Sequence, residues 1–418
     1  MSRLLSLNSY HYRRGGSDAV YFDHAKLFDD LGWENAYFSM HHPKNVETPW
    51  SKYFVEELEL SHDYSMLQKI SMSAKAVYSL EAQRKLKMVI EEFQPNIAHA
   101  HCIYHHLSPS VMPVLKKADV PVVMTAHDLK IACPAYKMMN SSGICERCKS
   151  GNYLHLLKHK CLHNSLAVSG LVMVEAYFNR MLKSYRNNLS KIVTPSRFFK
   201  DKLVEWGWPQ EMIVYIPNFI HYDGYTPDYN PGDYFLFFGR LAEEKGADTL
   251  IRASAKSGCK VKFAGTGPEE DNLRKLAESL DANVEFKGFC SGDTLHDLVR
   301  GCRSVILASQ WYENAPISIL EAYAFGKTVI GANIGGIPEM IVNDETGFLF
   351  DSGDMDQLAD QMSQVNALPD SKLIDMGKYA REYVEKTYSK ENYLDKTLEL
   401  YSELGVSSLS AEHSSSQA

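Results

Sequence analysis

The stretch YFLFFGRLAEEKGADTL, residues 234–250, begins with the apolar and aromatic run of a strand and continues into a helix. Gly239-Arg240 ends the strand, and Lys245-Gly246 opens the helix. Arg240 and Lys245 stand on the two sides of the connecting loop, so both cations can converge on one anion. Arginine offers a planar fork of donors and lysine a mobile point charge, a division of labour found around phosphates. The stretch therefore predicts a βα unit whose loop binds an anion.

Short β-rich runs alternate with helical segments along both halves of the chain, which is typical of βαβ units and parallel sheets. The strands expected in the first half are 3–9, 36–40, 97–101, 120–127 and 191–196, with a helix near 18–31. Those expected in the second half are 234–240, 260–265, 284–288, 304–309, 327–332 and 347–350. We expect an α/β fold of two doubly wound, Rossmann-like domains that face a central cleft. Ligands in such sheets bind beyond the carboxyl ends of the strands.

Segment 217–233 is rich in Pro, Gly and Asp and predicts a linker, which places the domains at 1–217 and 218–388. Residues 375–404 have a helical pattern with a kink expected near Ser389. We expect the helix at 389–404 to cross back onto the first domain. The last residues, 405–418, are small and polar, which favours a disordered tail.

Composition and charge bound the class of protein. The chain has 418 residues, of which 45% are hydrophobic and 23% charged, as in a soluble protein long enough for two domains. The longest apolar run, 166–174, is too short to span a bilayer, and the N-terminus has no secretory signal, so we expect a cytoplasmic protein.

The net charge of −8 hides a basic stretch, 137–200, with eleven Lys and Arg against two Glu. No nucleic-acid motif accompanies it; an anionic membrane surface, a diphosphate-bearing acceptor and a solvated basic face remain open.

A second stretch, QWYENAPISILEA at 310–322, carries Glu313 and Glu321 on either side of Ala-Pro. Pro316 is expected to be the first residue of a helix that runs to about Phe325, with Gly326 as its cap. The free amides of 315–318 would then face the cleft and hold oxygen atoms. The two carboxylates suit a polyhydroxylated ligand that is long enough to touch both. The alternative is one surface glutamate and one ordinary helix glutamate.

In this order, Arg240 and Lys245, AGTGPEEDNL at 264–273, the Glu313 and Glu321 pair and GANIGGIPEMI at 331–341 resemble the retaining GT-B glycosyltransferases of the GT4 type. These are the glycosyl transferases of group 1, and many assemble polysaccharides. The resemblance covers 234 to about 362 strongly. It reaches the first domain through Gly15-Gly16, HAH at 99–101 and TAHD at 125–128. It implies that the second domain binds a nucleotide-diphosphate sugar and that the first binds the acceptor.

The resemblance also implies roles for individual residues. Arg240 and Lys245 would neutralise the donor diphosphate, and Glu321 would hold the ribose hydroxyls. Glu313 and the amides of 315–318 would hold the donor sugar, with His127 near the reacting carbon. The implied donor-binding set is Gly15, Gly16, Gly239, Arg240, Lys245, Gly265, Gly267, Asn314, Ala315, Pro316, Ile317 and Glu321, and the implied catalytic set is His127, Arg240, Lys245 and Glu313. The family's loop has Glu-x-Phe-Gly where this chain has Glu-Asn-Ala-Pro, which leaves the sugar specificity open.

Three other groups of polar residues give weaker indications of function. HAHCIYHH at 99–106 is expected to face the acceptor, and we assign His101 and His105 to acceptor binding. Asp354 and Asp356 match the Asp-x-Asp of metal-dependent glycosyltransferases, but SGDMDQLADQM favours a helix N-cap. With Arg240 available, we expect no catalytic metal at the diphosphate. A Cys-rich insert is expected at about 133–161 in the first domain. Its four cysteines suit a structural zinc site or four free thiols, and the spacing does not decide between them: Cys133, Cys145, Cys148 and Cys161.

The sequence favours transfer of a sugar to an acceptor hydroxyl with the anomeric configuration retained. The acceptor would be a glycan or a lipid-linked glycan, and the basic stretch suggests peripheral contact with the inner face of the cell membrane. Two other classes remain. A GT-B nucleotide-sugar epimerase would lack the Glu313 and Glu321 pair, and a non-catalytic nucleotide-sugar sensor would lose His127 and Gly15-Gly16.

Overall fold

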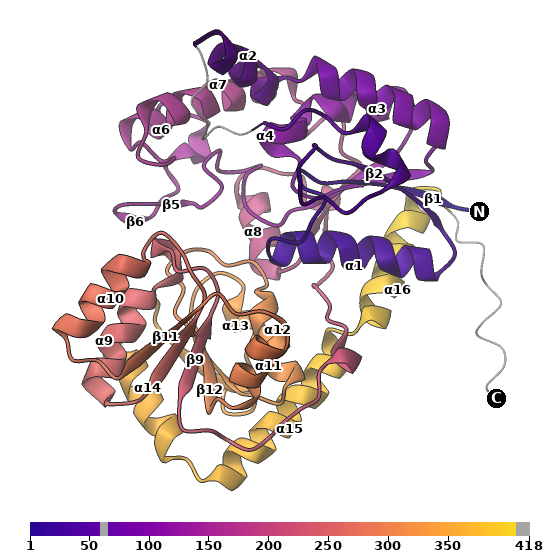
Figure 1. Cartoon of the computed structure of the whole chain (residues 1–418). Helices are drawn as coiled ribbons and strands as arrows, with labels where there is room; N and C mark the ends of the chain where they lie inside the picture. The colour runs from indigo at the N-terminus through magenta and orange to yellow at the C-terminus, as the bar shows by residue number, and fades with distance from the viewer. Residues whose placement is uncertain (59–65, 407–418) are drawn as a thin grey trace, which may run out of the picture.

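The computed structural model of the chain describes residues 1–58 and 66–406, and it has two α/β domains, each built on a parallel sheet (Figure 1). The first sheet has the strand order β2-β1-β3-β4-β7-β8. Its strands are β1 (Arg3–Leu7), β2 (Glu34–Phe38), β3 (Ile97–Ala100), β4 (Val122–Thr125), β7 (Lys191–Thr194) and β8 (Ile213–Tyr215). Sequence analysis predicted all of these strands except β8, which is short and follows a Trp-Gly-Trp segment without a clear alternation.

The second sheet has the strand order β11-β10-β9-β12-β13-β14, and all six of these strands were predicted. They are β9 (Phe235–Phe238), β10 (Val261–Ala264), β11 (Val284–Gly288), β12 (Ser304–Leu307), β13 (Val329–Ala332) and β14 (Gly347–Phe350). In each sheet the chain reverses its direction of winding once, between β1 and β3 in the first and between β9 and β12 in the second. Ligands of doubly wound sheets bind at these switch points.

Helices cover both faces of each sheet. Those of the first domain are α1 (Gly16–Asp30), α2 (Met66–Val77), α3 (Leu80–Phe93), α4 (Tyr104–Leu107), α5 (Met112–Lys117), α6 (Leu154–Lys158), α7 (Leu166–Leu182) and α8 (Arg197–Glu205). The later helices are α9 (Ala247–Ser257), α10 (Glu270–Ser279), α11 (Gly292–Arg300), α12 (Ile317–Ala324), α13 (Ile337–Met340), α14 (Met355–Ala367), α15 (Asp370–Thr387) and α16 (Lys390–Glu403). Short 3₁₀ turns are η1 (Pro49–Tyr53), η2 (Pro109–Val111), η3 (Arg147–Ser150), η4 (Gln210–Met212), η5 (Tyr222–Gly224) and η6 (Glu243–Lys245).

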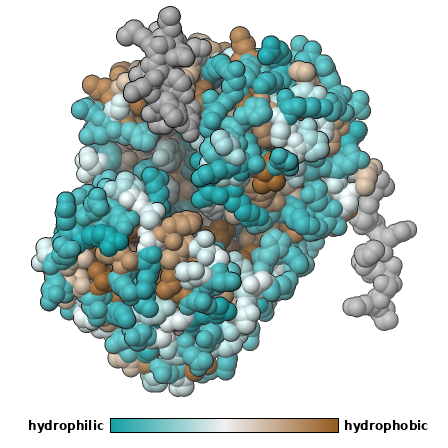
Figure 2. Space-filling model, viewed as in Figure 1, coloured by the Kyte–Doolittle hydropathy of each residue, from teal (hydrophilic) through white to brown (hydrophobic). Residues whose placement is uncertain are grey.

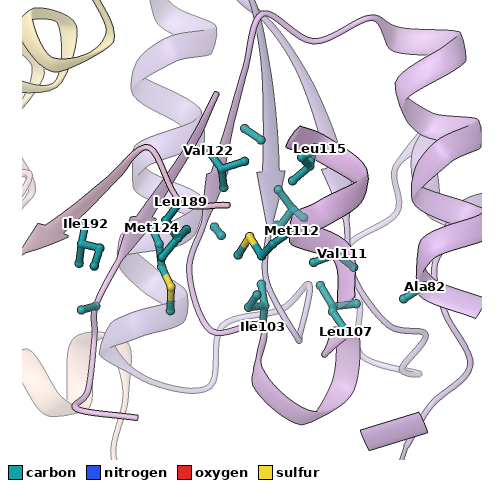
Figure 3. Packing of buried hydrophobic residues seen from close by; sticks show 14 of the residues in the cluster. Ala82, Ile103, Leu107, Val111, Met112, Leu115, Val122, Met124, Leu189 and Ile192 are labelled. Atoms are coloured by element: carbon teal, nitrogen blue, oxygen red, sulfur yellow. The ribbon is translucent and has the colours of Figure 1, made fainter. Parts of the chain in front are cut away.

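The strands are buried on both faces because successive side chains point to opposite sides of a sheet. On β4, Val122 and Met124 enter one core with α5, and Figure 3 shows them beside Met112 and Leu115. Val123 points the other way, into a core that includes residues of α1 and α16. This two-sided burial is why the strands appear in the sequence as short continuous apolar runs.

A segment after β4 forms an insert in the first domain. It contains the hairpin of β5 (Met139–Asn140) and β6 (Gly143–Ile144), which sequence analysis did not predict. Lys137 Nζ donates to Glu244 Oε2 at 3.0 Å, and Tyr312 OH donates to Glu146 Oε1 at 2.9 Å. The insert therefore contacts the second domain.

The C-terminal helices connect the two domains (Figure 1). The helix breaks at Tyr388 and Ser389, and α16 then packs on the first domain, where Tyr401 is fully buried. Val406 is buried and its amide donates to Tyr401 O, so the ordered chain extends beyond 405, where we expected the tail to start. The rest of that expected tail, 407–418, lies outside the described residues. Within the described ranges, none of the helices combines the length and the hydropathy needed to span a bilayer.

Tyr401 fixes α16 through two buried histidines, and its replacement by phenylalanine should destabilise the fold. Its hydroxyl is 3.0 Å from His24 Nε2 and 2.6 Å from His99 Nδ1. Tyr401→Phe leaves buried ring nitrogens unpaired, so we expect the free energy of unfolding to fall by ~1–3 kcal/mol in urea denaturation. Tyr379→Phe, at an exposed position on α15, is the matched control. Equal stability of the two variants would contradict this account of the α16 contact.

Candidate functional site

A cleft of about 1020 Å³ lies between the carboxyl ends of the two sheets, and Figure 2 shows the hollow between the domains. Both switch points open into it, since its lining includes the loops that follow β1, β9 and β12. Every residue of the predicted donor-binding and catalytic sets lines this cleft: Gly15, Gly16, His127, Gly239, Arg240, Lys245, Gly265, Gly267, Glu313, Asn314, Ala315, Pro316, Ile317 and Glu321. The tertiary structure thus brings together residues that are up to 306 positions apart in the sequence.

An ion pair between Lys245 and Glu313 lies across the switch point of the second sheet. Lys245 Nζ donates to Glu313 Oε1 at 2.7 Å, and the Ser309 hydroxyl donates to the same oxygen at 2.7 Å. Burial alone would raise the pKa of Glu313, but the charge of Lys245 and the hydrogen bonds hold it below its ordinary value. Glu313 is therefore ionised at neutral pH and is held in one position.

Arg240 follows β9 directly, and its guanidinium is exposed to the cleft. In the part of the chain that the structure describes, it forms no ion pair with a carboxylate. Burial raises the pKa of Tyr136, a residue of the insert that also lines the cleft. The positive charge of Arg240 opposes part of this rise. Arg240 is therefore a cation whose charge is available to an anionic ligand.

Helix α12 points its N-terminus into the cleft. Pro316 is the N-cap residue with ψ 122° and the helix starts at Ile317, one residue later than expected. The helix ends before Phe325, and Gly326 follows with φ +73°. Glu321 lines the same cleft, and burial raises its pKa to about 7. Its carboxyl group is therefore close to half ionised near neutral pH.

Glycines allow the loops around the cleft to approach one another. A Cβ on Gly265 would lie 1.9 Å from Gly239 O, and one on Gly336 would lie 1.8 Å from Asn314 O. Gly336 N also donates to Glu313 O at 2.8 Å. The GANIGGIPEMI motif thus packs against the backbone of Glu313 and Asn314 and holds it in place. On the opposite wall a Cβ on Gly16 would lie 3.5 Å from Ile317, so the first domain closely approaches the start of α12 there.

His127 follows β4 and enters the cleft from the first domain. Burial lowers its pKa to about 4, so the imidazole is neutral at physiological pH. Its Nε2 shares a hydrogen bond with His101 Nδ1 at 2.9 Å, and the two rings stack at 5.2 Å. His101 stacks in turn on His99. Three histidines of the HAH and TAHD motifs thus form one buried stack that holds the His127 ring.

Comparison with known proteins agrees with this arrangement. Residues 14–223 match the sequence model described as Glycosyltransferase Family 4, and residues 227–383 match the one described as Glycosyl transferases group 1. The chain belongs to glycosyltransferase family 4. Its fold is GT-B, as the resemblance of its motifs implied.

Individual relatives of this glycosyltransferase are distant. An uncharacterised 42.6 kDa protein in the cps region of Klebsiella pneumoniae is 25% identical over 84% of this chain and 90% of that protein. The GDP-mannose-dependent alpha-(1-6)-phosphatidylinositol monomannoside mannosyltransferase of Mycobacterium tuberculosis is 30% identical over 45% of this chain and 55% of that protein. The crystal structure of Anabaena HepE in complex with UDP has a TM-score of 0.67 and 18% identity, over 96% of this chain and all of that one.

The two predicted acceptor-binding histidines do not line the cleft of the glycosyltransferase. His101 is fully buried and contacts His127 instead. His105 Nδ1 lies 3.2 Å from Glu175 Oε2, and its Nε2 lies 3.5 Å from Lys130 Nζ, away from the cleft lining. A strand-end position suggested that both faced the acceptor, but the chain turns into α4 after Ile103 and carries His105 to another face.

Asn314 joins the two domains, a contact that sequence analysis missed. Its Oδ1 accepts from the Ser196 hydroxyl at 2.8 Å, and its Nδ2 donates to Ala126 O at 2.9 Å. Ala126 immediately precedes His127, so this amide sets the distance between His127 and the loop that carries Glu313. The family's Glu-x-Phe-Gly pattern leaves the position of Asn314 open, so the sequence carried no signal for this contact.

The predicted zinc site is not assembled. The four cysteines of the insert are free thiols, and within residues 1–58 and 66–406 no three His, Cys, Asp or Glu side chains are placed to hold a metal ion. Burial raises the pKa of Cys133 to about 11 and that of Cys148 to about 12, so both stay protonated. The Cys161 thiol donates to His155 O at 3.9 Å. Zinc binding by the four cysteines stays a prediction of the sequence, with free thiols as its alternative.

The Asp-x-Asp sequence has the structural role that its context indicated. Asp354 Oδ1 accepts from the amides of Asp356 and Gln357, at 2.9 and 3.0 Å, and thereby caps α14. Asp356 pairs with Lys256 at 2.8 Å on the surface. Neither aspartate lines the cleft.

Removing Lys245 should reverse the pH dependence of stability. The folded pKa of Glu313 lies below its ordinary value of 4.5, so the pair stabilises the fold above that pH and loses its contribution as pH falls through the folded pKa. In Lys245→Met the carboxylate stays buried without its cation, at a cost of ~3 kcal/mol at pH 7. Burial then raises the Glu313 pKa, so the variant should lose stability as pH rises above 4.5.

The measurement is urea denaturation of the wild type and of Lys245→Met between pH 3 and pH 8. The double variant Lys245→Met/Glu313→Gln removes both charges and should recover most of the lost stability. A double variant as unstable as the single one would show that the ion pair does not account for the loss.

Proposed function

We propose that this protein is a retaining glycosyltransferase that transfers a sugar from a nucleoside-diphosphate sugar to an acceptor hydroxyl. One observation carries the proposal: two cations, two carboxylates and a neutral imidazole, contributed by both domains, line a single cleft at the switch points of both sheets. Membership of glycosyltransferase family 4 supports it, as does the GDP-mannose dependence in the name of the Mycobacterium relative.

The donor would lie along the second domain. Arg240 and Lys245 neutralise its diphosphate, and the Glu321 carboxylate accepts hydrogen bonds from the ribose hydroxyls. Glu313 and the amides of 315–318 hold the donor sugar. Because Lys245 is already bonded to Glu313, the cation at the diphosphate and the carboxylate at the sugar are positioned by the same contact.

Transfer would proceed on one face of the donor sugar. The bond between the anomeric carbon and the phosphate oxygen breaks, the acceptor oxygen forms the new bond on the same face, and the departing phosphate oxygen takes the acceptor proton. Arg240 and Lys245 stabilise the negative charge that develops on the diphosphate, so the reaction requires no divalent cation. Neutral His127 orients the sugar through a hydrogen bond near the reacting carbon.

The acceptor is proposed to be a growing glycan of a cell-surface polysaccharide or a lipid-linked glycan. The basic stretch 137–200 supports an anionic acceptor and peripheral contact with the inner face of the membrane. The Mycobacterium relative is named for a phosphatidylinositol-linked acceptor. An epimerase or a non-catalytic sensor is less well supported, because Glu313, Glu321, His127 and Gly15-Gly16 all line one cleft.

The test is incubation with a panel of nucleotide sugars, with and without glycan acceptors and with EDTA in parallel, while release of nucleoside diphosphate is measured. Arg240→Ala should lower kcat/KM on the order of 10²-fold, by analogy with the loss of one charge-stabilising donor elsewhere. Arg252→Ala, an exposed arginine on α9 outside the cleft lining, is the control. Undiminished turnover of Arg240→Ala would refute its role, and absence of release with every donor would refute the transferase.

Donor binding should release a proton near neutral pH. Burial raises the pKa of Glu321 to about 7 in the free protein, whereas ribose hydroxyls that donate to the carboxylate favour its charged form and lower the pKa in the complex. Affinity for the nucleoside diphosphate should therefore fall by up to about tenfold between pH 8 and pH 6, or ~1.4 kcal/mol. Calorimetric titration in buffers of different ionisation enthalpy measures the proton. Glu321→Gln should abolish the release, and a wild type without proton release would contradict the ribose contact.

A further inference from the structure

A second cavity, of about 400 Å³, lies within the first domain. It has the size of a small-molecule site, which is typically about 300–1,000 Å³. Ile131, Ala132 and Pro134 line it, while Asp128 and Tyr136, from the same loop, line the donor cleft. One loop of the insert thus contributes to both cavities. The donor assignment uses none of the residues of this second cavity.

The lining of the cavity is strongly basic. It contains five cations and one acid: Lys130, Lys149, Arg180, Lys183, Arg186 and Glu175. Glu175 is already neutralised, because Lys130 Nζ lies 3.0 Å from its carboxylate and His105 lies 3.2 Å from it. Although burial would raise the pKa of Glu175, these neighbours hold it at about 2. Lys149 is paired with Glu205.

Three cations at the cavity therefore keep their charge available. Arg180, Lys183 and Arg186 have no carboxylate partner in residues 1–58 and 66–406. Arg186 donates to Gly207 O at 2.6 Å and stacks over Trp208 at 5.2 Å, which fixes its position. The guanidinium of Arg180 packs directly on Gly151. A Cβ added to Gly151 would lie only 1.1 Å from it, so no larger residue fits there without moving Arg180. A favourable contact with the C-terminal dipole of α7 accounts for Arg180 and Lys183 in part, but it does not account for Arg186.

Polar atoms without partners lie beside the cavity. Three lining side chains contain a buried polar atom with no hydrogen bond: Asn179 Oδ1, the Tyr185 hydroxyl and Trp206 Nε1. Asn179 is only 8% exposed. Buried polar atoms are rarely left unpaired in a folded protein. These three atoms have almost no accessible surface, so they lie just behind the walls of the cavity rather than open to it.

Aromatic walls complete the match to a saccharide. Tyr153, Tyr185, Trp206 and Trp208 all line the cavity, and such rings offer a flat apolar surface beside a polar edge. The C–H face of a sugar ring is apolar while its rim bears hydroxyls. A flat lipid surface would not reach aromatic rings inside a concave cavity, whereas a single charged sugar would.

We propose that this cavity binds an anionic sugar residue, one that bears a carboxylate or a phosphate, of the growing glycan acceptor. The assignment to the acceptor rests on the proposed glycosyltransferase function, because the cavity shares a loop with the donor cleft. Arg180, Lys183 and Arg186 neutralise the anionic group, and the tryptophans and tyrosines hold the ring. His105, predicted to bind the acceptor directly, acts here by fixing Glu175 and Lys130 at one wall.

The test is isothermal titration of the full chain, without donor, using glucose 6-phosphate, glucuronic acid, glucose and inorganic phosphate. Both anionic sugars should bind at least tenfold more tightly than glucose and than phosphate alone. Tighter binding of glucose 6-phosphate or of glucuronic acid distinguishes a phosphorylated from a carboxylated residue. Equal binding of glucose and its anionic forms, or of phosphate and glucose 6-phosphate, would overturn the proposal.

Variants connect the binding to this cavity. Arg180→Gln/Lys183→Gln should weaken binding of the anionic sugar at least tenfold. The control Arg84→Gln/Lys87→Gln removes an exposed pair at the same helical spacing on α3 and should bind like the wild type. Equal losses in both double variants would overturn the proposal. So would a wild type that binds no sugar but whose binding to phosphatidylglycerol vesicles is lost in the cavity variant, since the basic residues would then serve a membrane.

Titration with nucleoside diphosphate separates this proposal from the proposed function. Both double variants should bind UDP or GDP at the donor cleft as the wild type does, which also shows that they are folded. Anionic sugar binding without any binding of nucleoside diphosphate would leave the cavity assigned and refute the donor site. The reverse result would refute the cavity alone.

Discussion

The side chain of Asn314 determines how the two halves of the site meet. Its amide bonds the loop after β12 to Ala126 at the end of β4, and its carbonyl oxygen accepts from Ser196 at the start of α8. Glu313 on one side and His127 on the other are the direct neighbours of these contacts in sequence. Groups from both domains line one cleft, and this partly buried amide is one of the contacts that fix their separation, together with the Lys137–Glu244 and Tyr312–Glu146 contacts.

Charge is distributed around the cleft in an unequal way that suits a diphosphate. Lys245 is compensated by Glu313, whereas Arg240 is exposed and has no carboxylate partner in the described part of the chain. The paired lysine holds the Glu313 carboxylate in position, and the unpaired arginine supplies net positive charge. Glu321, with a pKa of about 7, completes the set with a group that a ligand can ionise. The second cavity, in the first domain, is basic as well, and three of its cations have no carboxylate partner among the described residues.

Buried histidines and tyrosines tie the C-terminal helix to the site. Tyr401 of α16 bonds His24 and His99, His99 stacks on His101, and His101 bonds His127. Burial lowers the pKa of each of these histidines, so the stack is neutral and its members act as hydrogen-bonding groups. The helix that connects the two domains is therefore in contact, through the rings of Tyr401, His99 and His101, with the imidazole of His127 that lines the cleft.

The sequence alone determined the two parallel sheets, apart from β8, and the set of residues that line the cleft, because apolar runs, turn glycines and charged strand ends are local patterns. Arg240, Lys245, Glu313 and Glu321 could be found in this way, since each lies at a fixed distance from a strand end. Only the tertiary structure decided the contacts between distant segments: the Asn314 amide at Ala126, the burial of His101, the position of His105 beside Glu175, and the second cavity. These contacts depend on which chain segments pack together. The residue pattern within one segment does not show which distant segment it will pack against. The same limit applies to the four cysteines, whose spacing suited zinc: only the fold of the insert sets which of them are buried, Cys133 and Cys148, and which are partly exposed, Cys145 and Cys161.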